Sequence, residues 1–242
     1  MTKPKLYVIY YSTWGHVRKL AETIKEEAAK NDEVDVSIWQ IAETLSQEVL
    51  TKMHAVPKAD HSIITPLEIA NADAFIFGEY SKRVAVFACT PTLYGNMPAQ
   101  FKTFWDATGQ LWAKGQLYGK LGAIFFCTAH SGQEPTALDF LTTLVQHGIL
   151  YVPLGYFDVP RITDMAEIGD SAYGAGTIRN GSRQISVSCP AQVHDRKFNT
   201  TGLLKLVVTI NLQDKEFDIA RHQGREFAKT VVQYHHGRST GN

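Results

Sequence analysis

The chain has 242 residues, and its 24 Lys and Arg residues balance 24 Asp and Glu residues, which gives a formal net charge of zero. Hydrophobic residues make up 44% of the chain and charged residues 20%, a composition that excludes wholesale disorder. A protein that binds nucleic acid usually carries an excess of basic residues, so nucleic acid is disfavoured as a main partner.

No apolar run approaches the roughly 20 residues that a membrane-spanning helix needs, so we expect no transmembrane segment. Residues 6–11 are apolar but too few for the core of a secretory signal. The three cysteines, Cys89, Cys127 and Cys189, form no Cys-x-x-Cys motif, which excludes a disulfide framework and a cysteine-rich zinc site. We therefore expect a reduced, cytoplasmic protein.

Apolar strands alternate with amphipathic helices along the chain. The pattern predicts strands over residues 5–11, 34–41, 74–78, 122–128 and 149–154. Helices are predicted over residues 17–31, 97–108, 135–146 and 215–234. Residues 43–66 are polar and predict a surface connection. Such alternation is typical of a doubly wound α/β fold, and we expect a flavodoxin-like, five-stranded parallel sheet of order 2-1-3-4-5.

Ligands bind such a sheet at the loops that leave the carboxyl ends of its strands. The first of these loops consists of Ser12, Thr13, Trp14, Gly15, His16 and Val17. Because a helix begins here, free backbone N–H groups and the positive end of the helix dipole can hold a phosphate without Lys or Arg. The dipole alone contributes only about 0.3–1 kcal/mol, so several N–H and O–H donors must share the task. A plainer interpretation is that Ser12 or Thr13 only caps the helix.

Two further loops follow later strands. The second covers residues 90–97, and its candidate binding residues are Thr92, Leu93, Tyr94, Gly95 and Asn96. Tyr94 offers a flat face to a planar ring, although an ordinary start of a helix explains the pattern equally well. The third covers residues 128–134, and its candidate binding residues are Thr128, Ala129, His130, Ser131 and Gly132. Each loop alone is weak evidence, but three at successive strand ends indicate a binding site because the topology brings them together.

Competing motifs are absent or incomplete. Residues 115–120 resemble a phosphate-binding P-loop but are one residue short and lack the following Ser or Thr. No G-x-G-x-x-G follows the first strand, and neither H-E-x-x-H nor G-x-S-x-G occurs. Cys127 lies in a predicted buried strand and is expected to be a core thiol, and we expect no metal site.

Together, these loops resemble the WrbA-type family of flavodoxin-like NAD(P)H:quinone oxidoreductases, in particular its fungal members. The resemblance covers most of the chain and runs through residues 11–17, 90–100, 104–115, 152–156, 173–178 and 219–224. It implies an FMN-dependent enzyme in which NAD(P)H reduces the flavin and leaves, and a quinone then takes two electrons. The cofactor performs this chemistry, so no catalytic side chain is expected. The resemblance further implies a homo-oligomer, a dimer or tetramer, that protects against oxidative stress.

The resemblance also implies roles for particular residues. The loop from Ser12 to Val17 would surround the FMN phosphate, the loop from Thr92 to Asn96 would border the isoalloxazine ring, and the loop from Thr128 to Gly132 would supply backbone contacts on the other side. Trp112 matches an aromatic of the quinone pocket, which family members contribute near a neighbouring subunit's flavin. Trp14 matches an aromatic near the nicotinamide, and ordinary packing is the alternative for both tryptophans. A family His that contacts FMN falls on Gln146.

The chain departs from the family pattern at several places. Leu93 replaces an Arg, and residues 79–89 and 185–211 have no counterpart in the family. We expect one domain over residues 1–242 with insertions at these two segments, which are either translated intron sequence or a genuine elaboration. The departures keep a second function open, namely a flavodoxin-like structural or scaffold protein with weakened or lost FMN binding.

Overall fold

The computed structural model describes residues 2–81, 96–128, 133–159, 171–178 and 214–240. Within these ranges, the strands are β1 (Lys5–Tyr10), β2 (Asp35–Gln40), β3 (Ala74–Ser81), β4 (Leu121–Thr128), β5 (Leu150–Tyr151) and β6 (Gly176–Ile178). They pair in parallel in the order β2-β1-β3-β4-β5. The predicted fold class and strand order are confirmed.

Two short strands share the outer position beside β4. β5 pairs with Leu121 and Gly122 at the start of β4, and β6 pairs with residues 126–128 at its end. The predicted strand over residues 149–154 is therefore too long, and β6 was not predicted. A three-residue strand such as β6 is too short to show the alternation by which strands are predicted.

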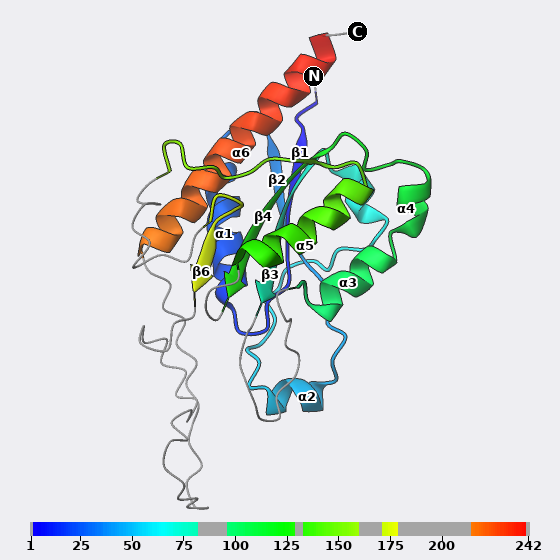
Figure 1. Cartoon of the computed structure of the whole chain (residues 1–242), viewed down its shortest axis with the longest axis vertical. Helices are drawn as coiled ribbons and strands as arrows, with labels where there is room; N and C mark the ends of the chain where they lie inside the picture. Colours follow the sequence, from blue (N-terminus) through cyan, green and yellow to red (C-terminus); the bar gives the residue numbers. More distant parts are fainter. Residues whose placement is uncertain (1, 82–95, 129–132, 160–170, 179–213, 241–242) are drawn as a thin grey trace, which may run out of the picture.

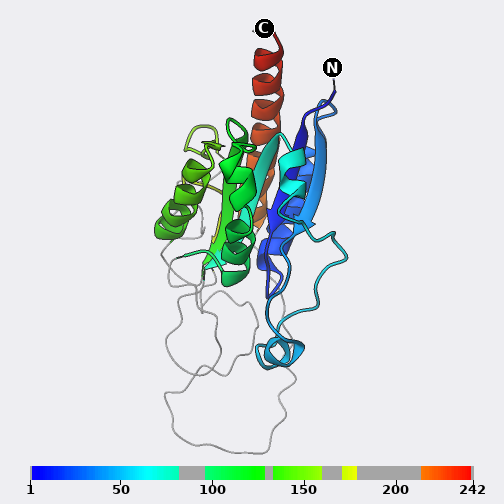
Figure 2. The same cartoon turned by 90° about the vertical axis from the view of Figure 1, so that its right-hand side faces the viewer.

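Helices cover both faces of the sheet. The helices α1 (His16–Ala28) and α6 (Asp214–Thr240) pack on one face (Figures 1 and 2). The helices α3 (Ala99–Asp106) and α5 (Gln133–Gln146) pack on the other face, together with the short helix α4 (Gly109–Ala113) that follows α3. The connection between β2 and β3 contains α2 (Gln47–Lys52) and the 3₁₀ helix η1 (Glu68–Asn71). Within the described ranges, none of the helices combines the length and hydrophobicity that crossing a membrane requires.

Strand alternation builds two separate apolar cores. In β1, Leu6 and Val8 face α1 and α6, whereas Tyr7 and Ile9 face α3 and α5. All eight residues of β4 are buried, Cys127 among them, because this strand is covered on both faces. The predicted core position of Cys127 is confirmed.

The helix boundaries differ modestly from the predictions. α1 begins at His16 and ends at Ala28, and α6 continues to Thr240, six residues beyond its predicted end. The connection over residues 43–66 contains α2, which was not predicted because none of its residues is buried, so it shows no apolar face. α2 begins where the Ser46 hydroxyl accepts a hydrogen bond from the Val49 amide at 3.4 Å.

The first expected insertion begins inside the sheet. Residues 79–81 belong to β3 and lie opposite residues 126–128 of β4. Residues 82–89 and 185–211 lie outside the described residues, so a single domain with two insertions stays a prediction. Sequencing the transcript decides whether the segments are translated intron, because a spliced message that still encodes both identifies them as genuine protein.

Gly224 lies where α6 packs tightly against the backbone of α1. A Cβ atom at this position would lie 2.5 Å from the backbone oxygen of Ile24 in α1. Gly237 lies on the same helix and has nothing within 4 Å of its Cβ position. The same helix therefore has one glycine without room for a side chain, Gly224, and one with open space around it, Gly237.

We expect Gly224→Ala to lower the free energy of unfolding by about 1–3 kcal/mol, because the backbone of α1 must shift to admit the methyl group. Gly237→Ala should leave stability unchanged or raise it by up to about 1 kcal/mol, since alanine favours the helix over glycine. Urea unfolding of the two variants measures both effects. Equal stability of the two variants would contradict the assigned contact.

Candidate functional site

The carboxyl ends of β1, β3 and β4 lie at one edge of the sheet. The Tyr11 amide donates to the Gly78 carbonyl at 3.1 Å, and Ser81 lies opposite Thr128. The three loops predicted to bind a ligand all leave from this edge, and α2 lies beyond it (Figure 1). Of the candidate binding residues, the structure describes all of those in the first loop, Asn96 in the second and Thr128 in the third. The other proposed residues lie outside the described residues, namely Thr92, Leu93, Tyr94, Gly95, Ala129, His130, Ser131 and Gly132.

The turn between β1 and α1 has the geometry of an anion-binding loop. Gly15 has a φ of 86°, the left-handed conformation that glycine adopts without penalty. Its amide donates to the Ser12 hydroxyl oxygen at 3.0 Å, which leaves the hydroxyl hydrogen able to donate to a ligand. No side chain caps α1 at Gly15, and no acidic residue lies in its first turn. The Ser12 hydroxyl thus binds an amide at the start of α1, so a purely structural role for Ser12 stays an alternative to ligand binding.

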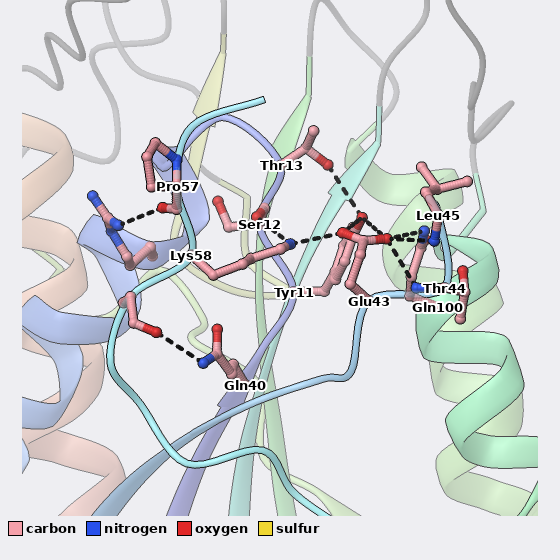
Figure 3. Close-up of polar contacts among 12 residues, drawn as sticks. Tyr11, Ser12, Thr13, Gln40, Glu43, Thr44, Leu45, Pro57, Lys58 and Gln100 are labelled. Carbon is pink, nitrogen blue, oxygen red and sulfur yellow. Dashed lines mark hydrogen bonds and ion pairs between the residues drawn. The ribbon is translucent and has the colours of Figure 1, made fainter. Parts of the chain in front are cut away.

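A remote segment holds three consecutive residues of this turn. The Trp14 indole donates to the Met53 carbonyl at 3.1 Å, and the Val56 amide donates to the Thr13 carbonyl at 3.0 Å. The Lys58 ammonium donates to the Ser12 carbonyl at 3.1 Å (Figure 3). Residues 53–58, which follow α2, therefore determine the shape of the turn.

Glu43 lies at the centre of the polar network beside the turn (Figure 3). Its carboxylate accepts hydrogen bonds from Lys58 at 2.9 Å, from the Tyr11 hydroxyl at 2.9 Å and from the Gln100 side chain at 3.0 Å. The amides of Thr44 and Leu45 also donate to it, at 3.0 and 3.1 Å. Burial by itself raises the pKa of this carboxyl, but Lys58 and the amide donors outweigh it and keep the pKa below its ordinary value.

Tyr11 connects Glu43 to the turn. Burial, together with the neighbouring Glu43, raises the pKa of the Tyr11 phenol, so the hydroxyl stays protonated and donates to the carboxylate. The Thr13 hydroxyl lies 3.4 Å from the Tyr11 oxygen. Since Gln100 belongs to α3, the chain of contacts from Thr13 through Tyr11 and Glu43 links the first loop to the helix that follows the second.

Trp112 and Gln146 lie together but away from this edge. The Trp112 indole donates to the Gln146 carbonyl at 2.8 Å, and the Trp112 side chain is 56% exposed. Gln146 is the last residue of α5, two residues before Gly148. The Gly148 carbonyl accepts a hydrogen bond from the Gly119 amide, which lies just before the start of β4. Gln146 is therefore near the amino end of β4. The eight residues of β4 separate the two ends of the sheet by about 25 Å at about 3.3 Å per residue. Within one chain, these two residues therefore lie far from the β1–α1 turn.

His147, next to Gln146, turns into the protein. Its Nε2 atom lies 3.0 Å from the Thr108 hydroxyl, and its ring packs against Trp105. Burial lowers its pKa. Within the described part of the chain, no group of three His, Cys, Asp or Glu side chains is arranged to hold a metal ion.

Comparison with known proteins identifies the family. The model of the family described as NADPH-dependent FMN reductase matches residues 4–164. This chain belongs to that family. NAD(P)H quinone oxidoreductase PST2 of Candida albicans is 39% identical over 97% of this chain and 99% of its own length. The P25 protein of Schizosaccharomyces pombe is 40% identical over 93% of this chain and 95% of its own length.

Other relatives agree with this assignment. Quinone-oxidoreductase QR2 of Triphysaria versicolor is 48% identical over 75% of this chain and 86% of its own length. The crystal structure of a WrbA-like flavodoxin from Agrobacterium tumefaciens superimposes with a TM-score of 0.55 at 19% identity, over 96% of this chain and 99% of that chain, which supports the fold. The resemblance inferred from the loop motifs is confirmed.

The sequence motifs did not reveal Glu43 and Lys58. Both lie in the polar stretch over residues 43–66, where neither periodicity nor a motif marks them. Their proximity to Ser12 arises only when the chain returns from α2 to the edge of the sheet. Lys58 therefore places a basic side chain beside the turn. The sequence had predicted a site of backbone N–H and hydroxyl donors without Lys or Arg.

Replacing Gly15 tests the geometry of the turn. We expect Gly15→Ala to lower the free energy of unfolding by about 1–2 kcal/mol, because alanine is strained at a φ of 86°. Gly109→Ala is the control, since Gly109 has nothing within 4 Å of its Cβ position and no positive φ. Chemical denaturation of the ligand-free proteins measures the difference, and equal stabilities would contradict the left-handed turn.

The lowered pKa of Glu43 predicts a pH dependence of stability. A carboxyl whose pKa is lower in the folded protein stabilises the fold above its unfolded pKa, near 4.5, and loses that contribution as the pH falls through the folded pKa. The stability difference between the wild type and Glu43→Gln should therefore be largest at neutral pH and shrink below about pH 4.5. Denaturation curves at pH 3.5 to 7 measure it, and a difference that grows in acid would refute the assignment.

Proposed function

We propose that this protein reduces quinones by two electrons with NAD(P)H as reductant and FMN as cofactor. The observation that carries the proposal is the match to the NADPH-dependent FMN reductase family together with relatives named NAD(P)H quinone oxidoreductase that align over almost the whole chain. When bound, FMN accepts a hydride from the nicotinamide and passes two electrons to the quinone.

The residues of the β1–α1 turn fit the phosphate of FMN. The start of α1 offers backbone amides without a capping side chain, and Ser12 and Thr13 add hydroxyls to the same turn. We assign Ser12, Thr13, Trp14, Gly15, His16 and Val17 to the phosphate. This donor set binds a phosphate through neutral groups, and the hydroxyls orient it relative to the sheet edge.

The isoalloxazine ring is assigned to the other loops of the same edge. Asn96 lies just before α3 and Thr128 ends β4, and both belong to the edge that carries the turn. We propose that Thr92, Leu93, Tyr94, Gly95, Ala129, His130, Ser131 and Gly132 complete the ring site. These residues orient the ring and leave one face open to NAD(P)H and to the quinone in succession, and Trp14 contributes to the nicotinamide side.

We further propose that the protein is a homo-oligomer, a dimer or tetramer. Trp112 and Gln146 lie at the far end of β4 from the turn of their own chain, so they serve a flavin only if a second copy presents it. The exposed Trp112 side chain then lines the quinone pocket beside Gln146 of the same chain. A cytoplasmic location and a role in protection from oxidative stress complete the proposal.

Flavin content and turnover test the proposed function. The purified protein should be yellow or bind added FMN, and it should oxidise NADH or NADPH with benzoquinone as acceptor. Because the two substrates occupy one face in turn, initial rates should give parallel double-reciprocal lines. A colourless protein that rejects added FMN would refute the proposal and favour the scaffold alternative.

A further inference from the structure

An ion pair lies directly behind the β1–α1 turn, on the side of the Ser12 carbonyl. The Lys58 ammonium lies 2.9 Å from the Glu43 carboxylate and 3.1 Å from the Ser12 carbonyl oxygen (Figure 3). It also lies 4.3 Å from the centre of the Tyr11 ring. The Glu43 and Lys58 side chains are only 16% and 31% exposed, so solvent screens the pair less than an ordinary surface pair.

The Ser12 carbonyl presents a problem for an anion-binding turn. The turn binds a phosphate through N–H and O–H donors, and a carbonyl oxygen among them carries a partial negative charge that repels the phosphate. The hydrogen bond from Lys58 fixes the direction of this carbonyl and offsets its charge. The turn can therefore present donors to an anion while the Ser12 carbonyl is occupied by Lys58.

The Lys58 side chain must be held in one conformation to reach the Ser12 carbonyl. A lysine side chain has a long flexible stem, and ordering it costs conformational entropy. Glu43 offsets this cost, because its carboxylate is itself fixed by Tyr11, Gln100 and the amides of Thr44 and Leu45. The pair is neutral as a whole, so its effect on a phosphate comes from the arrangement of the turn and not from a free positive charge.

We infer that Lys58 and Glu43 are positioning residues for the phosphate of FMN, and that they act by holding the Ser12 carbonyl away from the anion. This inference rests on the proposed function, because it concerns the cofactor assigned to the turn. The two residues act through Ser12 and have no assigned contact with the flavin ring. They thus determine how strongly the site distinguishes FMN from riboflavin, which lacks the phosphate.

The test compares FMN and riboflavin binding to the full-length protein after removal of its flavin. We expect Lys58→Met to weaken FMN binding about ten-fold, since it removes a charged hydrogen bond, and to change riboflavin binding less than about two-fold. Lys52→Met is the matched control, because Lys52 lies on α2 in an exposed pair with Glu48. Flavin fluorescence titrations give the dissociation constants, and thermal unfolding of the flavin-free proteins shows whether each variant folds.

Glu43→Gln is the second variant. We expect it to weaken FMN binding several-fold without a matching loss for riboflavin, because Lys58 is no longer held against the Ser12 carbonyl. Tighter FMN binding by Glu43→Gln would show that Lys58 acts as a free cation toward the phosphate and would overturn the positioning role. Equal losses of FMN and riboflavin in Lys58→Met, or no loss of either, would overturn it as well. If the wild type binds neither flavin, the proposed function itself fails.

Discussion

Parallel strand pairing is the constraint on which the site depends. Because β1, β3 and β4 run in the same direction, their carboxyl ends meet at one edge, and every loop that follows them begins there. Gly15 turns the chain at this edge in the left-handed conformation, and α1 begins with its amides toward the edge. The amphipathic pattern of α1 then fixes the direction of the helix, since Leu20 and Ile24 must face the sheet. The turn to which we assign the phosphate of FMN is thus shaped by the same packing that forms the core.

The turn does not depend on local sequence alone. Residues 53–58 bind the backbone of Ser12 and Thr13 and the side chain of Trp14, although about 40 residues separate them along the chain. A loop held by a remote segment loses less entropy when a ligand orders it, which favours tight binding. The network centred on Glu43 extends this support to α3 through Gln100. One carboxylate therefore connects the first loop to α3, the helix that follows the second loop.

Trp112 and Gln146 lie at the end of the sheet opposite the β1–α1 turn. Both belong to the side of the sheet where β4 begins, and neither can approach the turn of its own chain. An exposed tryptophan in this place has no role within the described part of one chain beyond its hydrogen bond to Gln146. The proposed association with a second copy would give it one, because Trp112 could then line the quinone pocket beside the partner's flavin.

The sequence by itself determined the order of strands and helices, the edge of the sheet from which the candidate loops leave and the family. These features are local, because apolar alternation, helical periodicity and short motifs can be recognised within a few consecutive residues. Sequence patterns missed the end of α6 and the helix α2. They also missed that two short strands, β5 and β6, share the outer position of the sheet, since short or polar elements carry little periodicity. Only the tertiary structure brought Glu43 and Lys58 to Ser12 and separated Gln146 from the turn. Such contacts depend on how distant segments return to the sheet, and no local pattern encodes that path.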